Sequence, residues 1–431
     1  MSTWKEVKLK KFIHKLGDGG TPSTLDPANF GGNIPWVVIE DIKNEIFSTK
    51  ETLTEKGLKS CSAKMWPTGS VILSTGATIG EVGIAKIDLC TKQGITGIVC
   101  NEHLNNYFLK YWLQLNKNTL FRFSQGTTFK EIRPRPLGNL RIKTPSPFEE
   151  IGVLEQEAIA GIPSKVDEAI EAVENSIKAA ERLKKSLMQN LLTGRLKTDG
   201  TWRTEEEFYI DEKFGQIPLG WIIEKGNKIT DKITKGQSPK WQGFEYGKSG
   251  MLFITSENVR DGYLDISEPK YLPIEFNEKI RTSQLLNGDI LINIVGASIG
   301  RSCVFNGEAE VANINQAVCL FRLSDSYHND FFAYYFQHPL TIHRLLCNQV
   351  ETARANLSLG DFRKLKLIFP EDIEEQKAIA KKISVFNSVL QAKQSKIQSL
   401  KTLKKSLMQN LLTGKVRVDV KKINQRLKEV N

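Results

Sequence analysis

The residues LKKSLMQNLLTG occur twice in this chain, at 183–194 and again at 403–414, so that twelve consecutive letters recur at an offset of 220 positions. Self-similarity at a fixed period marks a repeated structural unit. The sequence therefore predicts a tandem duplication. Shorter matches share the offset of 220 or one of 217: Glu155-Gln156 with Glu375-Gln376, Gly76-Ala77-Thr78-Ile79-Gly80 with Gly296-Ala297-Ser298-Ile299-Gly300, and Trp4 with Trp221.

Each copy opens with roughly 150 residues that are rich in Gly, Pro and short β-prone runs. Such runs, bounded by Gly, Asn and Pro, are typical of strands in a compact β-rich module. A helix is predicted at 105–117 in the first copy and at 329–346 in the second, because bulky residues recur there at helical spacing. The predicted strands include 36–39, 71–73 and 98–99 in copy one and 252–254, 290–292 and 318–321 in copy two.

The remainder of each copy is predicted to form one long helix. Apolar residues alternate by threes and fours over 379–411, a heptad pattern that 159–191 keeps in the same register. Each helix is followed by a glycine, the usual left-handed cap residue. Gly161 and Pro163 interrupt the first helix, so a kink or a broken first turn is expected there.

Two helices with apolar seams, each following an equivalent module, are expected to pair antiparallel and to place the modules at opposite ends of a rod of roughly 60 Å. The predicted fold class is α+β, with two β-rich modules in a tandem pseudo-twofold repeat, separated by an antiparallel pair of long coiled-coil helices. The alternative is two amphipathic helices that pack separately, each on its own module.

The two parts of the repeat have diverged to different degrees. The helices keep twelve identical residues, whereas the modules align only at scattered positions. A coiled-coil seam alone would require Leu187 and Leu191 but not the polar residues around them. We therefore expect both helix ends to dock the same kind of partner and each module to recognise something different. The candidate docking residues are Lys184, Lys185, Gln189, Asn190 and Thr193, with Lys404, Lys405, Gln409, Asn410 and Thr413.

The chain is basic, with 60 Lys and Arg against 49 Asp and Glu and a formal net charge of +11. No uncharged apolar stretch approaches the ~20 residues needed to span a bilayer, which argues against a membrane protein. The six cysteines form no CxxC pair, so reduced thiols and a cytoplasmic location are expected. A basic balance favours a polyanionic partner such as nucleic acid, although the excess is uneven: residues 1–150 carry +6, 195–372 carry −3 and 373–431 carry +10.

Over essentially its whole length, the sequence resembles the specificity subunit of type I restriction-modification enzymes. Taken singly the shared motifs are weak, but they occur in the same order in both copies. They are the Pro-x-Gly-Trp motif at Pro218–Trp221, of which the first copy keeps only Trp4; the Gly-x-x-Ile-Gly turns; a Pro followed by Glu-Gln-x-x-Ile before each helix; and the terminal Leu-Leu-Thr-Gly at 191–194 and 411–414.

The resemblance implies that each module is a target recognition domain that reads one half of a bipartite site in double-stranded DNA. It also implies that the helices set the spacer and dock two modification (methyltransferase) subunits, and that restriction subunits join the full complex. This chain would perform no chemistry and bind no cofactor, since S-adenosylmethionine, ATP and Mg²⁺ belong to the partner subunits. The implied segments are 1–150 (domain 1), 151–194 (spacer helix 1), 195–217 (linker), 218–372 (domain 2), 373–414 (spacer helix 2) and 415–431 (basic tail).

The sequence contains no catalytic constellation of its own. The Asn/Asp/Ser-Pro-Pro-Tyr/Phe motif of amino-methyltransferases is absent, and no GxGxxG opens a helix. The segment 243–249 has three residues between its glycines where a phosphate loop needs four. His338 and His343 are five apart, off the i, i+4 spacing that directs two ligands to one metal. We therefore expect no catalytic residue and no metal site.

For DNA contact, the sequence offers basic segments that precede each helix. Arg reads guanine bidentately, Lys and Arg neutralise phosphate, and Gln and Asn pair with adenine. For each residue, a solvated surface charge is the competing explanation. The candidates are Gln125, Lys130, Arg133, Arg135, Arg141 and Lys143 in copy one, Arg354, Asn356, Arg363, Lys364 and Lys366 in copy two, and the weaker choices Lys240, Arg260 and Arg301.

Two other functional classes remain open at this stage. A purely structural coiled-coil adaptor would leave the β-rich modules without a ligand. A stand-alone two-module DNA-binding protein would need no enzyme partners. Selection of DNA from random duplexes, with and without a modification subunit, would separate both from a specificity subunit.

Overall fold

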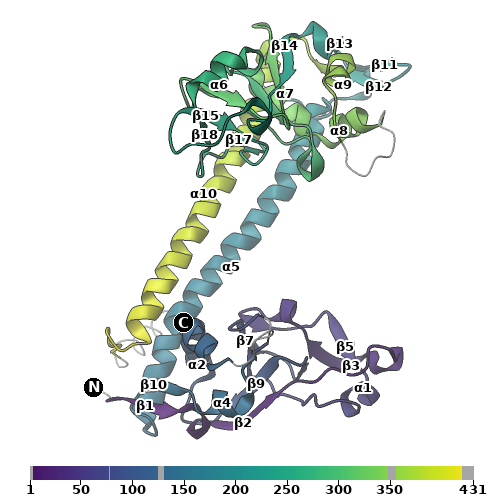
Figure 1. The fold of residues 1–431 in the computed structure, drawn as a ribbon. Helices are drawn as coiled ribbons and strands as arrows, with labels where there is room; N and C mark the ends of the chain where they lie inside the picture. Colours follow the sequence, from purple (N-terminus) through teal and green to yellow (C-terminus); the bar gives the residue numbers. More distant parts are fainter. Residues whose placement is uncertain (1–2, 77, 125–130, 348–355, 420–431) are drawn as a thin grey trace. The chain divides into compact units, whose positions relative to one another are not determined.

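The structure is a computed structural model of the full chain. It divides into two compact units, and each unit contains one β-rich module together with parts of two long helices (Figure 1). Unit 1 consists of Met1–Asn175 and Ser395–Asn431, and unit 2 consists of Ser176–Gln394. The described residues are 3–76, 78–124, 131–347 and 356–419.

Three sheets build the module of unit 1. Their strand orders are β2-β9-β6-β7-β4, β5-β3-β8 and β1-β10. The strands are β1 (Trp4–Lys8), β2 (Ile13–Asp18), β3 (Phe30–Val37), β4 (Glu45–Ile46), β5 (Glu51–Leu53), β6 (Val71–Ser74), β7 (Val82–Ala85), β8 (Cys90–Thr91), β9 (Ile95–Cys100) and β10 (Arg141–Pro145). The helices are α1 (Glu55–Lys59), α2 (Asn106–Leu115), α3 (Lys117–Phe123), α4 (Pro134–Gly138) and α5 (Glu150–Leu192).

The module of unit 2 repeats this plan with the orders β14-β22-β19-β20, β18-β15-β21 and β13-β23, and adds the hairpins β11-β12 and β16-β17. The strands are β11 (Phe208–Asp211), β12 (Gly215–Pro218), β13 (Trp221–Lys225), β14 (Thr230–Lys235), β15 (Met251–Ile254), β16 (Val259–Arg260), β17 (Tyr263–Leu264), β18 (Tyr271–Leu272), β19 (Ile290–Asn293), β20 (Ser302–Val304), β21 (Ala312–Ile314), β22 (Val318–Leu323) and β23 (Lys366–Pro370). The helices are α6 (Ile274–Lys279), α7 (Asn329–Gln337), α8 (Pro339–Leu346), α9 (Leu359–Lys364) and α10 (Ile373–Leu411).

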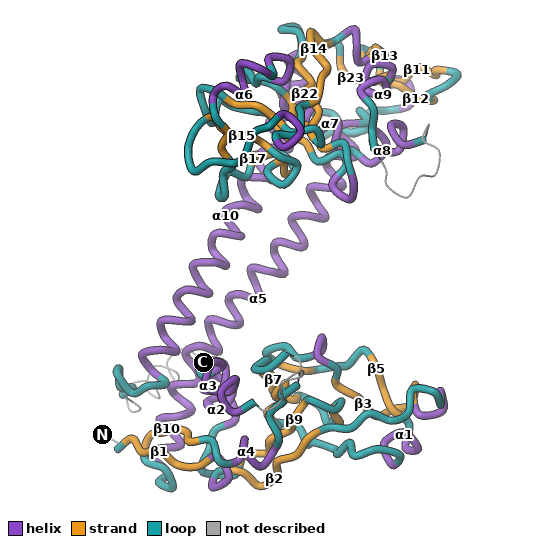
Figure 2. Tube along the Cα trace, viewed as in Figure 1, coloured by secondary structure: helices purple, strands orange, loops and turns teal. Residues whose placement is uncertain are grey.

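The two modules agree in register and, apart from the additional strand β4 in the largest sheet of unit 1, in strand order. Trp4 pairs with Pro145 at one end of β1-β10, and Trp221 pairs with Pro370 at the same end of β13-β23. The central strand of each three-stranded sheet forms one parallel and one antiparallel pair, β3 in unit 1 and β15 in unit 2. Strands and loops dominate both modules in Figure 2. The predicted tandem β-rich repeat is therefore confirmed.

The long helices α5 and α10 pack together and run antiparallel. In unit 1 the buried core contains Ile159 of α5 and Leu411 of α10. In unit 2 Leu191 of α5 and Ile379 of α10 share a core. Residue numbers therefore rise along one helix where they fall along the other. The end of α5 lies in the core of the module of unit 2, and the end of α10 lies in the core of the module of unit 1. The alternative of helices that pack separately, each on its own module, is therefore wrong.

Of the predicted kink or broken first turn at Gly161 and Pro163, the broken turn is wrong, because α5 continues through Pro163. A proline inside a helix removes one backbone hydrogen bond and clashes with the preceding turn. Here Pro163 is buried, and the preceding turn is held by Ile159 and Ala160, which are 0% and 2% exposed in the core of unit 1. This burial offsets the missing hydrogen bond.

The helices predicted within the modules are each divided in two. The segment 329–346 forms α7 and α8, which meet at His338 and Pro339. Proline disfavours helical geometry in the residue before it, and it is well tolerated at the first position of the next helix. The segment 105–117 likewise ends α2 at Leu115, and α3 follows.

Candidate functional site

Both modules carry the Gly-x-x-Ile-Gly turn at the same place in the fold. It joins β6 to β7 in unit 1 and β19 to β20 in unit 2. Gly80 has φ +94° and Gly300 has φ +86°, a left-handed conformation that favours glycine. A Cβ on Gly300 would also lie 2.1 Å from Ile342 Cδ1. The backbone conformation of the turn therefore favours glycine, and a larger residue at Gly300 would also displace the Ile342 side chain.

The chain that leads into α4 or α9 lies against this turn. Ile132 N donates to Thr75 O at 2.9 Å in unit 1, and Leu357 N donates to Ile294 O at 2.9 Å in unit 2. The predicted contact Asn356 is exposed at this place. Three other predicted DNA contacts of these segments lie outside the described residues: Gln125, Lys130 and Arg354.

Four of the predicted DNA contacts form what we call the helix-edge group, because they lie at α4 and α9. Arg133 and Arg135 are exposed at the start of α4, and Arg363 and Lys364 are exposed at the end of α9. Arg363 Nη2 also donates to Ile233 O at 3.1 Å. These cations follow directly on the segment that lies against the turn, so the structure brings the two features together in each module.

Three other predicted DNA contacts lie on strands instead and have a different environment. Arg141 and Lys143 are exposed on β10, and Lys366 is exposed on β23. Lys143 Nζ donates to Thr413 O at 3.2 Å, which places it at the end of α10. Lys366 Nζ lies 5.7 Å from the ring centroid of Phe214 in the β11-β12 hairpin. These residues are close in sequence to the helix-edge group but have other contacts: Lys143 with the end of α10 and Lys366 with the β11-β12 hairpin.

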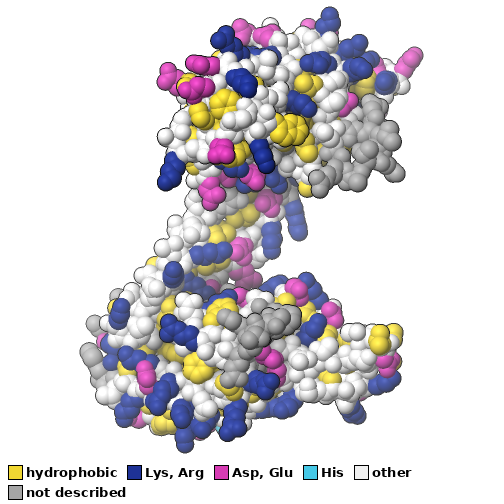
Figure 3. Space-filling view, viewed as in Figure 1, with side chains coloured by type: hydrophobic (Ala, Val, Ile, Leu, Met, Phe, Trp, Pro, Cys, Tyr) yellow, Lys and Arg dark blue, Asp and Glu magenta, His cyan; other side chains and the backbone are white. Residues whose placement is uncertain are grey.

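Arg260 and Arg301 line a groove of about 1090 Å³ in unit 2. The same groove is lined by Lys184, Lys185 and Gln189 of α5. The structure thus brings two predicted DNA contacts together with three predicted partner contacts. Elsewhere, Lys and Arg side chains are spread over the visible face of unit 1, the lower part of Figure 3.

Sequence reasoning missed two exposed apolar side chains, one of them next to Lys240. Trp241 is 85% exposed in the short 3₁₀ helix Lys240–Gln242 that follows β14. Leu25 is 93% exposed in the loop that follows the equivalent strand β2. Apolar side chains can contact thymine methyl groups in the major groove. Their exposure in the structure is the only feature that makes these residues candidates for DNA contact, and exposure cannot be seen in the sequence.

The final leucines of the repeat are buried in the module cores. Leu191 and Leu192 are 0% and 3% exposed in unit 2, and Leu411 and Leu412 are 5% and 2% exposed in unit 1. The identical letters of the repeat therefore partly reflect identical packing. This internal cause competes with the docking of a partner as the explanation for the repeat.

The glycine that ends each repeat packs beneath a tryptophan. Gly194 has φ +69°, and a Cβ there would lie 2.3 Å from Pro218 Cγ and 3.0 Å from Trp221. Gly414 has φ +74°, and its Cβ would lie 3.0 Å from Trp4. In unit 2 the Pro-x-Gly-Trp and Leu-Leu-Thr-Gly motifs therefore form one contact, of which unit 1 keeps the glycine and the tryptophan.

We expect Gly194→Ala to lower the free energy of unfolding by about 3 kcal/mol, through backbone strain and overpacking. Gly200→Ala is the matched control, since Gly200 has φ +95° but no other atom lies within 4 Å of the place that a Cβ would take there. The control should cost only the strain, about 1 kcal/mol. Urea denaturation measures both, and equal losses would contradict the packing contact.

In unit 2, Glu375 at the start of α10 connects the end of α5 to the module. Its Oε1 accepts from Trp221 Nε1 at 3.2 Å and from Arg203 Nη2 at 2.8 Å. Arg203 Nη1 in turn donates to Gly194 O at 2.6 Å, at the end of α5. One carboxylate therefore joins the first residue of β13, the start of one helix and the end of the other.

Unit 1 contains the same arrangement of a glutamate, a tryptophan and an arginine. Glu155 Oε1 accepts from Trp4 Nε1 at 3.4 Å and from Arg417 Nε at 2.9 Å. Arg417 and Arg203 are 214 positions apart, so they do not obey the offset of the repeat. The equivalence of these two arginines is a fact of the fold that the repeat in the sequence does not reveal.

The glutamine after each of these glutamates is fully buried and holds the start of a module helix. Gln156 Oε1 accepts from Asn105 N at 2.9 Å before α2. Gln376 Oε1 accepts from His328 N at 3.0 Å before α7. The Glu-Gln motif is therefore structural in both copies.

The predicted partner contacts fall into two sets. The half-buried set includes Lys404, whose Nζ lies 2.7 Å from Asp167 Oδ1, and Lys184, whose pKa is lowered by burial. The rest of this set consists of Asn190, Thr193, Asn410 and Thr413. The exposed set consists of Lys185, Gln189, Lys405 and Gln409.

Two exposed leucines of the repeat were not among the predicted partner contacts. Leu183 is 57% exposed and Leu403 is 48% exposed. Each lies in the same helix turns as an exposed Lys and Gln of the repeat. Both copies leave about half of an apolar side chain exposed at the same position, and this shared exposure strengthens the expectation of a partner.

A buried charge cluster connects the module of unit 1 with both long helices. Lys110 of α2 is 1% exposed, and its Nζ lies 3.7 Å from Asp167 Oδ2 of α5. Tyr111 Oη donates to the same Oδ2 at 2.9 Å, and Lys404 of α10 completes the cluster. Burial lowers the pKa of Lys110 to about 8, although Asp167 opposes the shift.

This shift predicts a dependence of stability on pH. The pKa of Lys110 is lower in the folded chain than the usual 10.5, so between about pH 8 and pH 10.5 the unfolded chain holds more protons, and stability rises with pH. We expect the unfolding free energy of the wild type minus that of Lys110→Met to rise by roughly 3 kcal/mol across this window. Urea denaturation at each pH measures the difference. Parallel curves for the two proteins would contradict the buried ammonium.

The described residues provide no group of three or more His, Cys, Asp or Glu side chains that could hold a metal ion. His343 Nε2 lies 3.2 Å from Cys347 Sγ, and His338 Nε2 has no hydrogen-bond partner within the described part of the chain. Of the helices that the structure describes, none is both long and apolar enough to cross a membrane.

Comparison with known proteins decides the family. The family model of the type I restriction modification DNA specificity domain matches residues 1–182 and 232–402, which is most of the chain and both copies of the repeat. This chain belongs to that family. It is a type I specificity subunit with two target recognition domains in tandem, and the resemblance seen in the sequence is confirmed.

Relatives and solved structures agree with this assignment. The MjaVIII specificity subunit of Methanocaldococcus jannaschii is 24% identical over 96% of this chain and 93% of its own length. The MjaIX specificity subunit of the same organism is 29% identical, over 60% of this chain and 58% of that subunit. The crystal structure of the S subunit from M. genitalium has a TM-score of 0.56 at 15% identity, over 95% of this chain and 96% of that one. A structure from a study of complex assembly and conformational transition of the type I system has a TM-score of 0.55 at 19% identity, over 95% and 97%.

Proposed function

We propose that this chain recognises a bipartite DNA site, each module reading one half. The observation that carries this proposal is the contrast within one repeated fold: the strand order, the register and the contacts at the helix ends are shared, whereas the exposed residues around the turns differ. Two equivalent scaffolds with different exposed side chains suit a reader of two different sequences.

The long helices set the distance between the half-sites, and their ends dock two modification subunits. The exposed residues that both copies of the repeat share support this part of the proposal, namely Leu183, Lys185 and Gln189 with their equivalents in copy two. Restriction subunits join the same assembly. The chain performs no catalysis and binds no cofactor, because the partner subunits supply S-adenosylmethionine, ATP and Mg²⁺ chemistry. It acts in the cytoplasm.

Selection from random duplex DNA tests this function. The chain is expected to enrich a two-part motif when it is mixed with a modification subunit of its own system. Enrichment by the chain alone, unchanged by the partner, would favour a stand-alone DNA-binding protein. Failure to enrich any motif in either mixture would contradict the proposal and favour a structural adaptor.

A further inference from the structure

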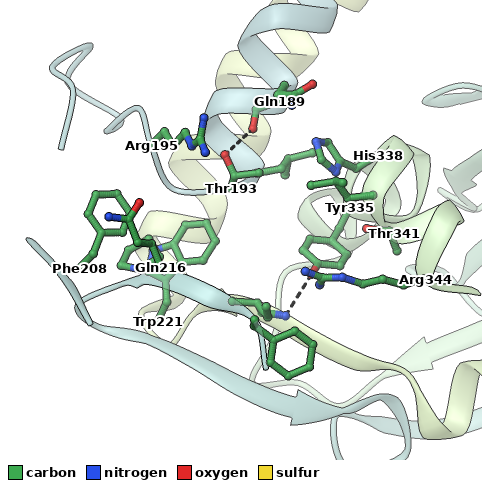
Figure 4. Close-up of a pocket in the computed structure, with 15 residues that line it drawn as sticks. Gln189, Thr193, Arg195, Phe208, Gln216, Trp221, Tyr335, His338, Thr341 and Arg344 are labelled. Carbon is green, nitrogen blue, oxygen red and sulfur yellow. Dashed lines mark hydrogen bonds between the residues drawn. The ribbon is translucent and has the colours of Figure 1, made fainter. Parts of the chain in front are cut away.

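A cavity of about 260 Å³ lies at the end of α5 in unit 2; we call it the α5-end pocket (Figure 4). Several elements form its wall. Gln189 comes from α5 and Thr193 follows directly after that helix, Phe208 and Gln216 come from the β11-β12 hairpin, and Arg344 comes from α8. The pocket therefore brings two of the candidate partner contacts together with a hairpin from the linker between the two copies.

The charged side chains that line the pocket are all positive. Arg195 and Arg344 line it, and none of its fifteen lining residues is Asp or Glu. Neither arginine forms an ion pair with a carboxylate of the described residues. Arg344 lies over the ring of Phe214, with its guanidinium carbon 5.2 Å from the ring centroid. Phe214 thus positions the guanidinium of Arg344, and a guanidinium without a carboxylate partner is suited to binding an oxyanion.

A buried histidine of the wall also lacks a partner. His338 is 4% exposed, and its Nε2 forms no hydrogen bond with any described residue. Burial, reinforced by Arg344, lowers the pKa of His338 to about 4, so the ring is neutral near pH 7. A neutral imidazole with its hydrogen on Nε2 is a donor, and an unsatisfied buried donor is costly. A bound acceptor would satisfy it.

Two apolar side chains are exposed at the rim of the pocket. Ile210 is 82% exposed, and the pairing of β11 with β12 places it on the same face of the hairpin as Phe208 and Gln216. Leu340, at the start of α8, is 45% exposed and also lines the pocket. An occupant that buries these side chains needs apolar groups on either side of its anion. A free phosphate lacks such groups, and a nucleic-acid backbone offers only sugar carbons between its charged phosphates.

We propose that the α5-end pocket binds the carboxylate of an acidic side chain flanked by apolar residues, on a protein that docks at the end of α5. This inference rests on the proposed function, in which modification subunits dock at the helix ends. The carboxylate accepts hydrogen bonds from Arg195, Arg344 and His338, while its apolar neighbours cover Ile210 and Leu340. One of the two docked subunits is thus held by a carboxylate that this pocket binds.

Native mass spectrometry of the chain with a modification subunit of its own system tests this. The wild type is expected to bind two modification subunits. The double variant Arg195→Gln with Arg344→Gln changes only the α5 end, so it should retain one subunit and bind the second at least about 30-fold more weakly. Lys228→Gln, which removes an exposed charge from the same unit outside the pocket, is the matched control and should bind two.

Other outcomes are equally decisive. If the wild type binds no modification subunit, the proposed function fails before the pocket is tested. If the double variant binds two subunits as tightly as the wild type, the pocket proposal is overturned. Because the arginine changes could impair folding, Ile210→Ser serves as a second variant, and it should weaken the same subunit. A thermal shift with inorganic phosphate in the wild type only, together with unchanged docking, would assign the pocket to a free anion instead and overturn the proposal.

Discussion

Replacing Asp167 by Ala is expected to lower the free energy of unfolding of unit 1 by about 3–5 kcal/mol. The carboxylate lies 2.7 Å from Lys404 Nζ and 3.7 Å from Lys110 Nζ, and it accepts a hydrogen bond from Tyr111 Oη. Its removal leaves two ammonium groups together in a buried site with no anion between them. Breaking a buried ion pair on one side is costly for this reason.

The second unit offers a matched control at the equivalent position. Asn387 lies at the offset of 220 from Asp167, and its Nδ2 donates to Tyr334 Oη at 3.0 Å. Asn387→Ala removes one neutral hydrogen bond and should cost about 1 kcal/mol. Urea denaturation gives the magnitudes, and hydrogen exchange in α2 assigns the loss to unit 1. Equal costs at the two positions would contradict the charged cluster.

Replacing Arg133 and Arg135 by Gln is expected to weaken binding to the selected DNA at least about 10-fold and to reduce the slope of log K against log salt by about 2. Both side chains are exposed at α4, next to the segment that lies against the Gly-x-x-Ile-Gly turn. If they neutralise phosphates, each releases counterions on binding, and the salt dependence reports this directly.

The control for this prediction removes the same charge from the same basic segment. Arg141 and Lys143 lie on β10, and Lys143 contacts the end of α10 through Thr413 O. Replacing both by Gln should leave the salt slope within experimental error. Fluorescence anisotropy at several salt concentrations measures both variants. Equal slopes for the two double variants would mean that total charge, rather than its location, determines binding.

The fold could be predicted from the sequence where the signal is periodic or repeated. The offset of 220 defined the two copies, and the heptads defined α5 and α10. The predicted break at Pro163 was wrong because tertiary burial of the preceding turn outweighed a local rule. The division at Pro339 was visible in the sequence, but the run of bulky residues across it masked the boundary.

The candidate site was less predictable, because its contacts join residues that are far apart in the chain. Lys404 and Asp167 are separated by 237 positions, and no local pattern connects them. Arg141 and Arg135 are close in sequence, yet they lie on a strand and a helix with different surroundings. The sequence offered the residue types that bind DNA, and their grouping required the fold.

The most direct test of the central claim is the DNA motif that the assembled enzyme methylates. Residues 218–372 are exchanged for the corresponding module of a specificity subunit with another target. Each chain is produced with the modification subunit in a host without other methyltransferases, and single-molecule sequencing identifies the methylated motif. The account predicts a two-part motif in which one half changes while the other half and the spacer stay the same. A motif that changes in both halves, or a single continuous motif, would contradict it.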